Sequence, residues 1–166
     1  MTNGEEFQEY GLPRATHEEA DGASGSVILG EGDYRYEVTG KDWGNLPEGW
    51  FYKEATSVAV DQQDRVFVFN RGNMPVIVYD TEGNMIDSWG EGVFANPHGI
   101  SVDLDGNLFC VDNNDSTVKK FTPTGELLMT LGEANKPAPP MSGRPFSAPT
   151  HVAADPSNGD FYVSDG

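Results

Sequence analysis

Two short motifs hold the side chains best suited to chemistry in this 166-residue sequence. His98 stands between a proline and a glycine, and a neutral imidazole in that setting can point a ring nitrogen at a metal ion. Arg71 stands between an asparagine and a glycine, and its guanidinium can bind a carboxylate bidentately or stabilise a developing oxyanion. The alternatives are a histidine that hydrogen-bonds a loop carbonyl and a surface arginine that pairs with a nearby acid.

A sequence repeat positions these motifs. Residues 57–90 and 99–132 align without gaps, so that Asp61 falls on Asp103, 42 residues later, and a third copy starts near residue 151. Counted from its own aspartate, Thr150 rather than His151 falls on His98. Because a shift of one residue along a strand turns a side chain to the other face, His151 is only a secondary candidate for the same site.

Each copy of the repeat contains short β-rich runs separated by turn residues. The predicted strands are 57–61, 65–69, 76–79 and 85–89, followed by 100–103, 108–111, 118–121 and 127–131. Four such runs in about 40 residues are typical of a β-propeller blade, folded as an antiparallel meander. A blade must pack on its neighbours to bury both faces, and Trp89 and Leu131 can fill the gaps between blades.

The sequence therefore predicts an all-β propeller in residues 30–166, with blades at about 55–90, 97–132 and 148–166, the last incomplete. Propellers have four to eight blades, so two and a half blades are expected to be part of a longer product or to complete a ring with other chains. Open blade edges would favour self-association. A proline-rich insertion at 133–147 delays the third copy and is expected to be a connector or a lid.

The composition excludes several classes of function. The net charge is −17, from 27 acidic and 10 basic residues, which disfavours nucleic acid and anionic membranes as partners. The first 29 residues are acidic and poor in apolar residues, and they predict a flexible leader without a secretory signal, hence a cytoplasmic protein. A strand is expected at 34–38, and Cys110 is expected to be a buried apolar residue.

Repeated aspartates have a structural interpretation. Asp61, Asp103 and Asp155 recur at one repeat position, where a carboxylate at the end of a strand accepts N–H bonds from the following turn. The stretch 112–115, with sequence DNND, has oxygen atoms suited to calcium. It lacks the spacing and the glycine of a dedicated calcium loop, so a hairpin turn is predicted there.

Four motifs resemble a known family: VFVFNRG at 66–72, NPHGISVD at 96–103, PTHVA at 149–153 and FYVSDG at 161–166. They are similar to the NHL-repeat propeller of peptidyl-α-hydroxyglycine α-amidating lyases and their bacterial relatives. The resemblance implies a six-bladed ring, a zinc ion held by histidines of alternate blades and a structural calcium. It implies that His98 is a zinc ligand and that Arg71 is the active-site arginine. The family often has histidine where this chain has Asn70, a secondary candidate for substrate contact.

Two functions follow as hypotheses. The first is a zinc-dependent lyase that cleaves peptidyl-α-hydroxyglycine to a peptide amide and glyoxylate. Catalytic zinc takes about three protein ligands, and these residues offer one strong candidate, so the chain by itself is expected to be inactive. The second is a non-catalytic NHL propeller that binds peptides or proteins on one face.

Overall fold

The computed structural model describes residues 27–38 and 43–166 and divides the chain into two compact units, Met1–Lys41 and Asp42–Gly166. In the first unit, strand β1 (Val27–Leu29) pairs antiparallel with β2 (Tyr36–Val38). The last three residues of the expected leader thus form a strand, and residues 1–26 lie outside the described residues. None of the described residues form a helix long and apolar enough to span a membrane.

The second unit consists of antiparallel sheets that follow one another along the chain. The first sheet has the order β3 (Ala55–Val60), β4 (Val66–Asn70), β5 (Val76–Tyr79) and β6 (Met85–Trp89). The second has the same order of β7 (Pro97–Val102), β8 (Leu108–Asp112), β9 (Thr117–Phe121) and β10 (Leu127–Leu131). The third pairs β11 (Pro149–Ala154) with β12 (Phe161–Asp165). These meanders confirm the predicted all-β blades.

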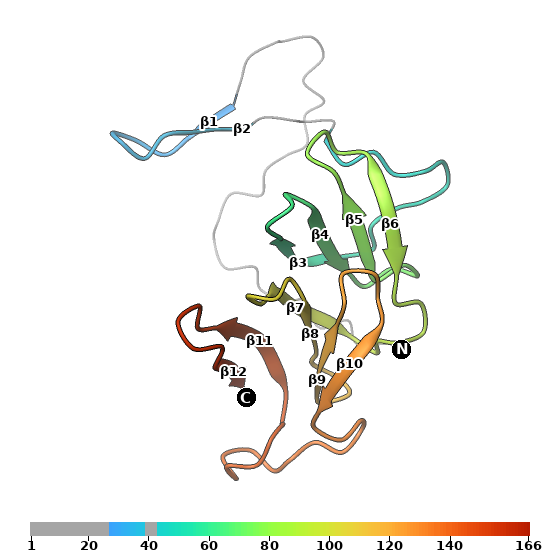
Figure 1. Cartoon of the computed structure of the whole chain (residues 1–166), viewed down its shortest axis with the longest axis vertical. Coiled ribbons are helices and arrows are strands. Elements are labelled where there is room, and N and C mark those ends of the chain that lie inside the picture. Colours follow the sequence, from blue (N-terminus) through green and yellow to red (C-terminus); the bar gives the residue numbers. More distant parts are fainter. Residues whose placement is uncertain (1–26, 39–42) are drawn as a thin grey trace, which may run out of the picture. The chain divides into compact units, whose positions relative to one another are not determined.

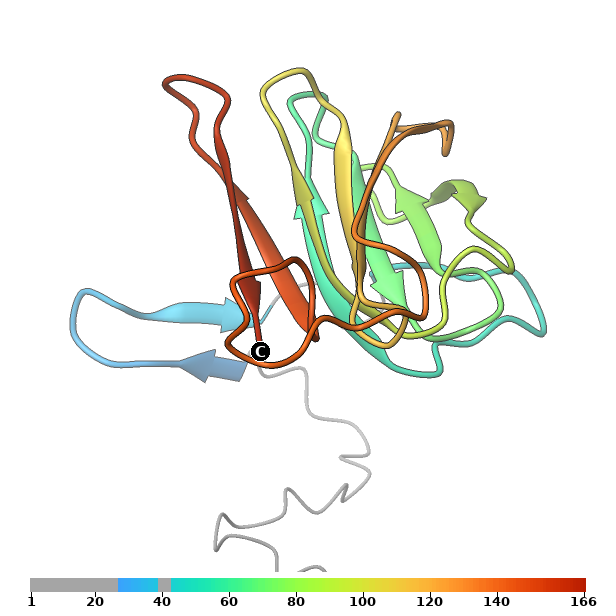
Figure 2. The same ribbon diagram turned by 90° about the horizontal axis from the view of Figure 1, so that it is seen from below.

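The blades fan out with their first strands next to one another. Strand β7 contacts both β3 and β11 (Figure 1). The hairpin turns after β3, β7 and β11 lie together at one end of the blades, seen as the teal, yellow and red tips in Figure 2. The opposite end therefore collects the starts of these three strands, the turns after β4 and β8 and the connections between blades.

Apolar side chains pack between neighbouring blades. The core between the first two blades consists of Phe67, Phe69, Val76, Val78, Ile100, Leu108, Cys110 and Phe121. Trp89 extends from β6 onto the second blade, with its ring 5.1 Å from that of Phe121 and its Nε1 donating to the carbonyl of Pro123 at 3.2 Å. Leu131 packs on the next core, which contains Val111 and Val152. Both residues fill gaps between blades, as predicted.

Cys110 and the repeated aspartates have the roles that the sequence predicts. Cys110 is fully buried in the core, and burial raises the pKa of its thiol. Asp61 Oδ1 accepts the backbone N–H groups of Gln63 at 3.0 Å and Arg65 at 2.9 Å. Asp103 and Asp155 accept backbone N–H groups of their own turns in the same way. These aspartates fix the hairpin between the first two strands of each blade.

We expect Val78→Ala to lower the free energy of unfolding by about 2 kcal/mol more than Val58→Ala. Val78 is 2% exposed in the core between the blades, whereas Val58, its matched control on β3, is 59% exposed. Both variants remove the same two methyl groups from a strand, so the larger loss at Val78 reports its burial. Urea unfolding followed by circular dichroism measures it, and equal losses for the two variants would contradict the packing.

Asp61 should make stability depend on acid pH. Burial raises the pKa of its carboxyl, but hydrogen bonds from the Arg65 side chain and from the N–H groups of Arg65 and Gln63 outweigh burial, so the pKa lies below its usual 3.8. The stabilisation is therefore present above 3.8 and is lost as pH falls through the lowered pKa. Urea unfolding should show wild type more stable than Asp61→Asn at neutral pH, with a gap that closes between about pH 4 and 2. A constant gap over that range would refute this role.

Candidate functional site

A buried carboxylate determines where the first strand of the second blade begins. Asp112, at the end of β8, is fully buried. It accepts the N–H groups of Ala95 and Asn96 at 2.5 and 3.1 Å and those of Asn114 and Asp115, both at 3.1 Å. The hairpin turn predicted at 112–115 is present and spans residues 113–116. Pro97 pairs with Asp112, so β7 begins three residues before the predicted start at 100 and includes His98.

The third blade repeats the bonds to the chain before its first strand, and the first blade repeats only the bonds to the turn. Asp165 accepts the N–H groups of Ser147 and Ala148 at 2.8–2.9 Å, directly before β11. In the first blade Asn70 takes this position. Its Oδ1 accepts the N–H of Gly72 at 2.7 Å, and its Nδ2 donates to the carbonyl of Met74 at 2.8 Å. Both ends of the Asn70 amide therefore hold the turn after β4.

Strand pairing shows which residues of the third blade occupy the positions of His98 and Gly99. Pro149 pairs with Asp165 as Pro97 pairs with Asp112. Thr150 therefore stands at the position of His98, and the exposed His151 stands at the position of Gly99, as the sequence alignment predicts. A Cβ on Gly99 would lie 2.7 Å from His151 Nδ1 and 2.5 Å from the Thr150 carbonyl oxygen. Only glycine permits this close approach of β7 and β11.

His98 is half-buried and is held by the next blade. Its Nδ1 lies 2.9 Å from the backbone carbonyl oxygen of Thr150. A carbonyl oxygen only accepts, so in the neutral imidazole the proton sits on Nδ1 and Nε2 has a lone pair. A ligand histidine is commonly oriented in this way, with one nitrogen donating to a carbonyl while the other binds the metal. The two interpretations of His98 are therefore compatible, because Nδ1 makes the hydrogen bond to the carbonyl and Nε2 can bind a metal.

Arg71 reaches from the first blade to the start of β7. Its Nε donates to the carbonyl of Pro97 at 3.2 Å, and its Nη1 lies 2.6 Å from Glu54 Oε2. Its backbone N–H also donates to the Glu54 carbonyl at 3.0 Å. The two candidates from the sequence therefore meet, because Arg71 bonds the residue that precedes His98. Glu54 was missed by sequence reasoning, since nothing distinguishes it among 27 acidic residues.

The donor atoms near this site suit a metal ion only in part. His98 offers one imidazole nitrogen, and no group of three histidine, cysteine or carboxylate side chains within residues 27–38 and 43–166 could hold a metal ion. The oxygens of Asp112 are occupied by backbone N–H groups, and those of Asp115 by Thr117 Oγ1 and Lys119 Nζ. The described residues thus fit one ligand of a zinc ion, and the 112–115 turn does not fit calcium.

The inserted loop at 133–147 is fastened to the second blade at the same end. The N–H of Asn135 donates to the Asp115 carbonyl at 2.8 Å, and Ser116 Oγ donates to the Ser147 carbonyl at 2.9 Å. Phe146 is buried in the core between the second and third blades. The two ends of the insertion are therefore anchored, while Met141 at its tip is fully exposed.

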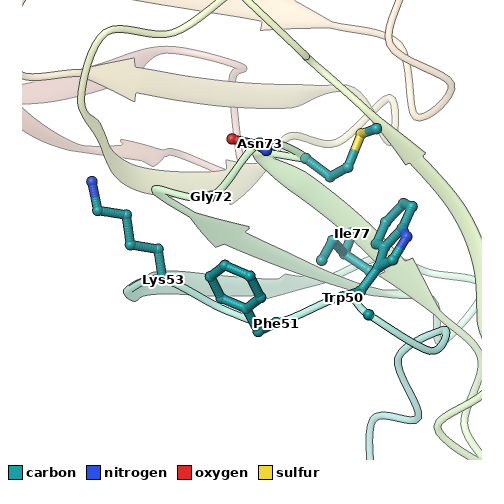
Figure 3. A pocket seen from close by; sticks show the side chains of 8 residues that line it. Trp50, Phe51, Lys53, Gly72, Asn73 and Ile77 are labelled. Carbon is teal, nitrogen blue, oxygen red and sulfur yellow. The ribbon is translucent and has the colours of Figure 1, made fainter.

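A pocket of about 290 Å³ lies between the segment before β3 and the turn after β4, and Gly72, the residue after Arg71, is part of its lining (Figure 3). One wall comes from the segment before β3 and the other from the turn after β4, with Ile77 of β5 between them. The lining residues are Gly49, Trp50, Phe51, Lys53, Gly72, Asn73, Met74 and Ile77. Sequence reasoning did not find this pocket, although the run WFY at 50–52 is a signal that could have pointed to it.

The hydrogen bond to Thr150 predicts the tautomer of His98. Long-range ¹H–¹⁵N correlation spectra at mildly alkaline pH should show its Nδ1 protonated and its Nε2 bare, because the carbonyl requires a donor on Nδ1. His98→Gln assigns the signals by removing them. The exposed His151 serves as the internal comparison. A spectrum in which Nε2 of His98 carries the proton would rule out the geometry described above.

The sequence is similar to curated lyases and to an NHL-repeat protein, although no family model matches it. Peptidyl-alpha-hydroxyglycine alpha-amidating lyase 1 of Drosophila melanogaster is 41% identical over 87 residues, which cover 51% of this chain and 15% of that protein. Peptidyl-glycine alpha-amidating monooxygenase A of Xenopus laevis is 35% identical over 111 residues, covering 62% and 12%. Human NHL repeat-containing protein 3 is 29% identical over 143 residues, covering 80% and 40%. The chain thus spans less than half the length of each of these relatives.

Solved structures show the same fold at low identity. Virginiamycin B lyase from Staphylococcus aureus superposes with a TM-score of 0.51 at 15% identity, over 67% of this chain and 34% of that one. A gluconolactonase from Xanthomonas campestris gives a TM-score of 0.52 at 16% identity, over 69% and 36%. These residues form a β-propeller, and their similarity in sequence to peptidyl-α-hydroxyglycine α-amidating lyases and NHL-repeat proteins confirms the resemblance found in the motifs.

Proposed function

We propose that this chain contributes to a C–N lyase that converts a peptidyl-α-hydroxyglycine to a peptide amide and glyoxylate. One observation carries the proposal. Arg71 crosses from the first blade to the Pro97 carbonyl, directly beside a histidine whose Nε2 keeps its lone pair. The similarity to the Drosophila lyase supports the choice of reaction.

Arg71 would bind the carboxylate of the hydroxyglycine. A guanidinium has five N–H donors in a planar fork. The Pro97 carbonyl and Glu54 engage Nε and Nη1 of Arg71 and fix the plane of the fork, and further N–H groups remain for a ligand. In the reaction the hydroxyl loses its proton, the carbon forms a carbonyl, the C–N bond breaks, and the nitrogen gains a proton to become the amide. Arg71 would hold the carboxylate of the nascent glyoxylate throughout.

His98 would be one ligand of a zinc ion in the complete site. Zinc at this position would supply Lewis-acid chemistry, favouring the deprotonated form of the substrate hydroxyl. The Thr150 carbonyl holds the imidazole ring and keeps the Nε2 lone pair available. Since catalytic zinc takes about three protein ligands, the others would come from beyond the described residues. We assign no residues to a calcium ion.

A non-catalytic NHL propeller that binds peptides is the second candidate. One observation favours it: Glu54 already neutralises Arg71. The similarity to human NHL repeat-containing protein 3 covers 80% of this chain. In this case Arg71 would still bind a peptide carboxylate, but no bond would be cleaved.

Glyoxylate release separates the two candidates. We expect the purified natural gene product that contains this sequence, supplied with zinc, to release glyoxylate from benzoyl-α-hydroxyglycine. Arg71→Lys and Arg71→Ala should lower kcat/KM, the alanine variant by about 100-fold or more, because the carboxylate loses its bidentate partner. Arg65→Lys is the matched control, since Arg65 pairs with Asp61 at the opposite end of the blades and should leave the rate unchanged.

The isolated 166-residue chain serves as the inactive control, because its described residues offer one strong zinc ligand. A zinc-loaded natural product that binds the substrate without releasing glyoxylate would overturn the lyase and leave the peptide-binding candidate. Stoichiometric zinc binding by the isolated chain would show that its metal site is more complete than we propose.

A further inference from the structure

We infer that Glu54 determines specificity at Arg71: the pair prefers a ligand with an N–H or O–H donor next to its carboxylate over a ligand that lacks the donor. The inference rests on the proposed function in one respect, because it places the ligand carboxylate on Arg71. Glu54 accepts the neighbouring donor, so the pair recognises two groups of the ligand instead of one.

One backbone hydrogen bond brings the two positions of this pair together in each of the three blades. It joins the residue before the first strand to the residue after the second strand. The N–H of the second residue donates to the carbonyl of the first in the pairs Arg71 and Glu54, Asn113 and Asn96, and Gly166 and Ala148, at 3.0, 3.2 and 3.4 Å. The fold therefore places these two residues side by side, whatever side chains they carry.

The side chains at these positions are charged in the first blade and neutral in the second. Glu54 Oε2 lies 2.6 Å from Arg71 Nη1, whereas Asn96 Nδ2 donates to Asn113 Oδ1 at 3.3 Å. The Glu54 side chain is 55% exposed, and an ion pair so exposed contributes little to stability. Because the second blade forms the same backbone contact with two amides, the architecture does not require the charges. We therefore assign them to ligand binding.

The pair stays accessible when further blades are present. Asn96, the counterpart of Glu54, has the first blade beside it and is still only half-buried. A blade that precedes the first would therefore leave position 54 open. Arg71 already has its following blade in place, because its Nε donates to the Pro97 carbonyl of that blade at 3.2 Å.

The remaining atoms of the pair complement a carboxylate and a neighbouring donor. Arg71 uses Nε for Pro97 and Nη1 for Glu54, and no hydrogen bond of Arg71 Nη2 or Glu54 Oε1 is recorded within residues 27–38 and 43–166. Arg71 Nη2 has two N–H donors for a carboxylate, and Glu54 Oε1 can accept an N–H or O–H from the next atom of the ligand. An α-hydroxyglycine has both donors on the carbon that carries its carboxylate. A simple carboxylate has neither and only brings a second negative charge beside Glu54.

The test compares two unreactive acids that differ in one group. N-benzoylglycine has an amide N–H where 3-benzoylpropanoate has a methylene group. In isothermal titration calorimetry, N-benzoylglycine should bind the purified natural gene product about tenfold more tightly, because only its N–H can donate to Glu54. Glu54→Gln should abolish this preference, because a glutamine that keeps its oxygen on Arg71 turns its NH₂ group toward the ligand.

Glu82→Gln is the matched control for the change in net charge. Glu82 is an exposed acid in the turn after β5, at the opposite end of the first blade, so its variant should keep the preference. Arg71→Ala should weaken both acids alike, because both lose the partner of their carboxylate. If Glu54→Gln weakened both acids alike and kept their ratio, Glu54 would only support Arg71 and the inference would be wrong.

The outcomes distinguish this inference from the lyase. Glyoxylate release together with equal binding of the two acids would overturn the role of Glu54 and leave the lyase intact. A preference that depends on Glu54, without glyoxylate release, would support the role of Glu54 and overturn the lyase. Unchanged binding of both acids by Arg71→Ala would show that the carboxylate does not lie on Arg71, which would remove the basis of the inference.

Discussion

The hydrogen-bonding side chain at the end of the second strand of each blade, buried at Asn70 and Asp112 and exposed at Asp165, is the feature on which the rest of the structure depends. Asp112 brings together the chain before β7 and the turn after β8 through four backbone N–H groups. A fully buried carboxylate is costly unless it is well hydrogen-bonded, and bonds to a charged acceptor contribute about 1.5–3 kcal/mol each. Asp165 bonds the chain before β11, whereas Asn70 bonds only the turn after β4. Asp112 and Asp165 thus determine where β7 and β11 begin, and therefore where His98 and Thr150 lie.

This constraint explains why residues from different blades meet. His98 reaches the third blade through the Thr150 carbonyl, and Arg71 reaches the second through the Pro97 carbonyl. Both contacts use backbone atoms at the starts of strands, so they depend on the positions that Asp112 and Asp165 fix. The apolar core between the blades, with Phe69 and Phe121 fully or almost fully buried, holds the sheets at the required separation. The site is thus a product of how blades stack, not of any single blade.

Much of the fold could be predicted because each blade is local in sequence. The runs at 76–79, 85–89 and 127–131 match their strands residue for residue, since short β-rich runs and the turn residues that bound them act over a few positions. The blade bounds of 97–132 include the start of β7, but the predicted run at 100–103 begins three residues late, because the start depends on Asp112, fifteen residues further along the chain. The partner of His98 lies in another blade, and Glu54 and the pocket depend on how two loops approach each other. No periodic pattern encodes such contacts.

The two ends of the blades differ in whether their buried or turn-forming aspartates pair with side-chain cations. At the hairpin end, Asp61 and Asp103 bond their own turns and also pair with Arg65 and Lys120, so both charges are neutralised locally. At the opposite end, Asp112 and Asp165 bond backbone N–H groups, and their charge is not matched by a side-chain cation among the recorded ion pairs of the described residues. Arg71, Lys53 and His98 Nε2 therefore keep bonding capacity that the architecture does not consume. This free capacity is why the proposed site lies at this end, although Arg71 also bonds the Pro97 carbonyl and Glu54 there.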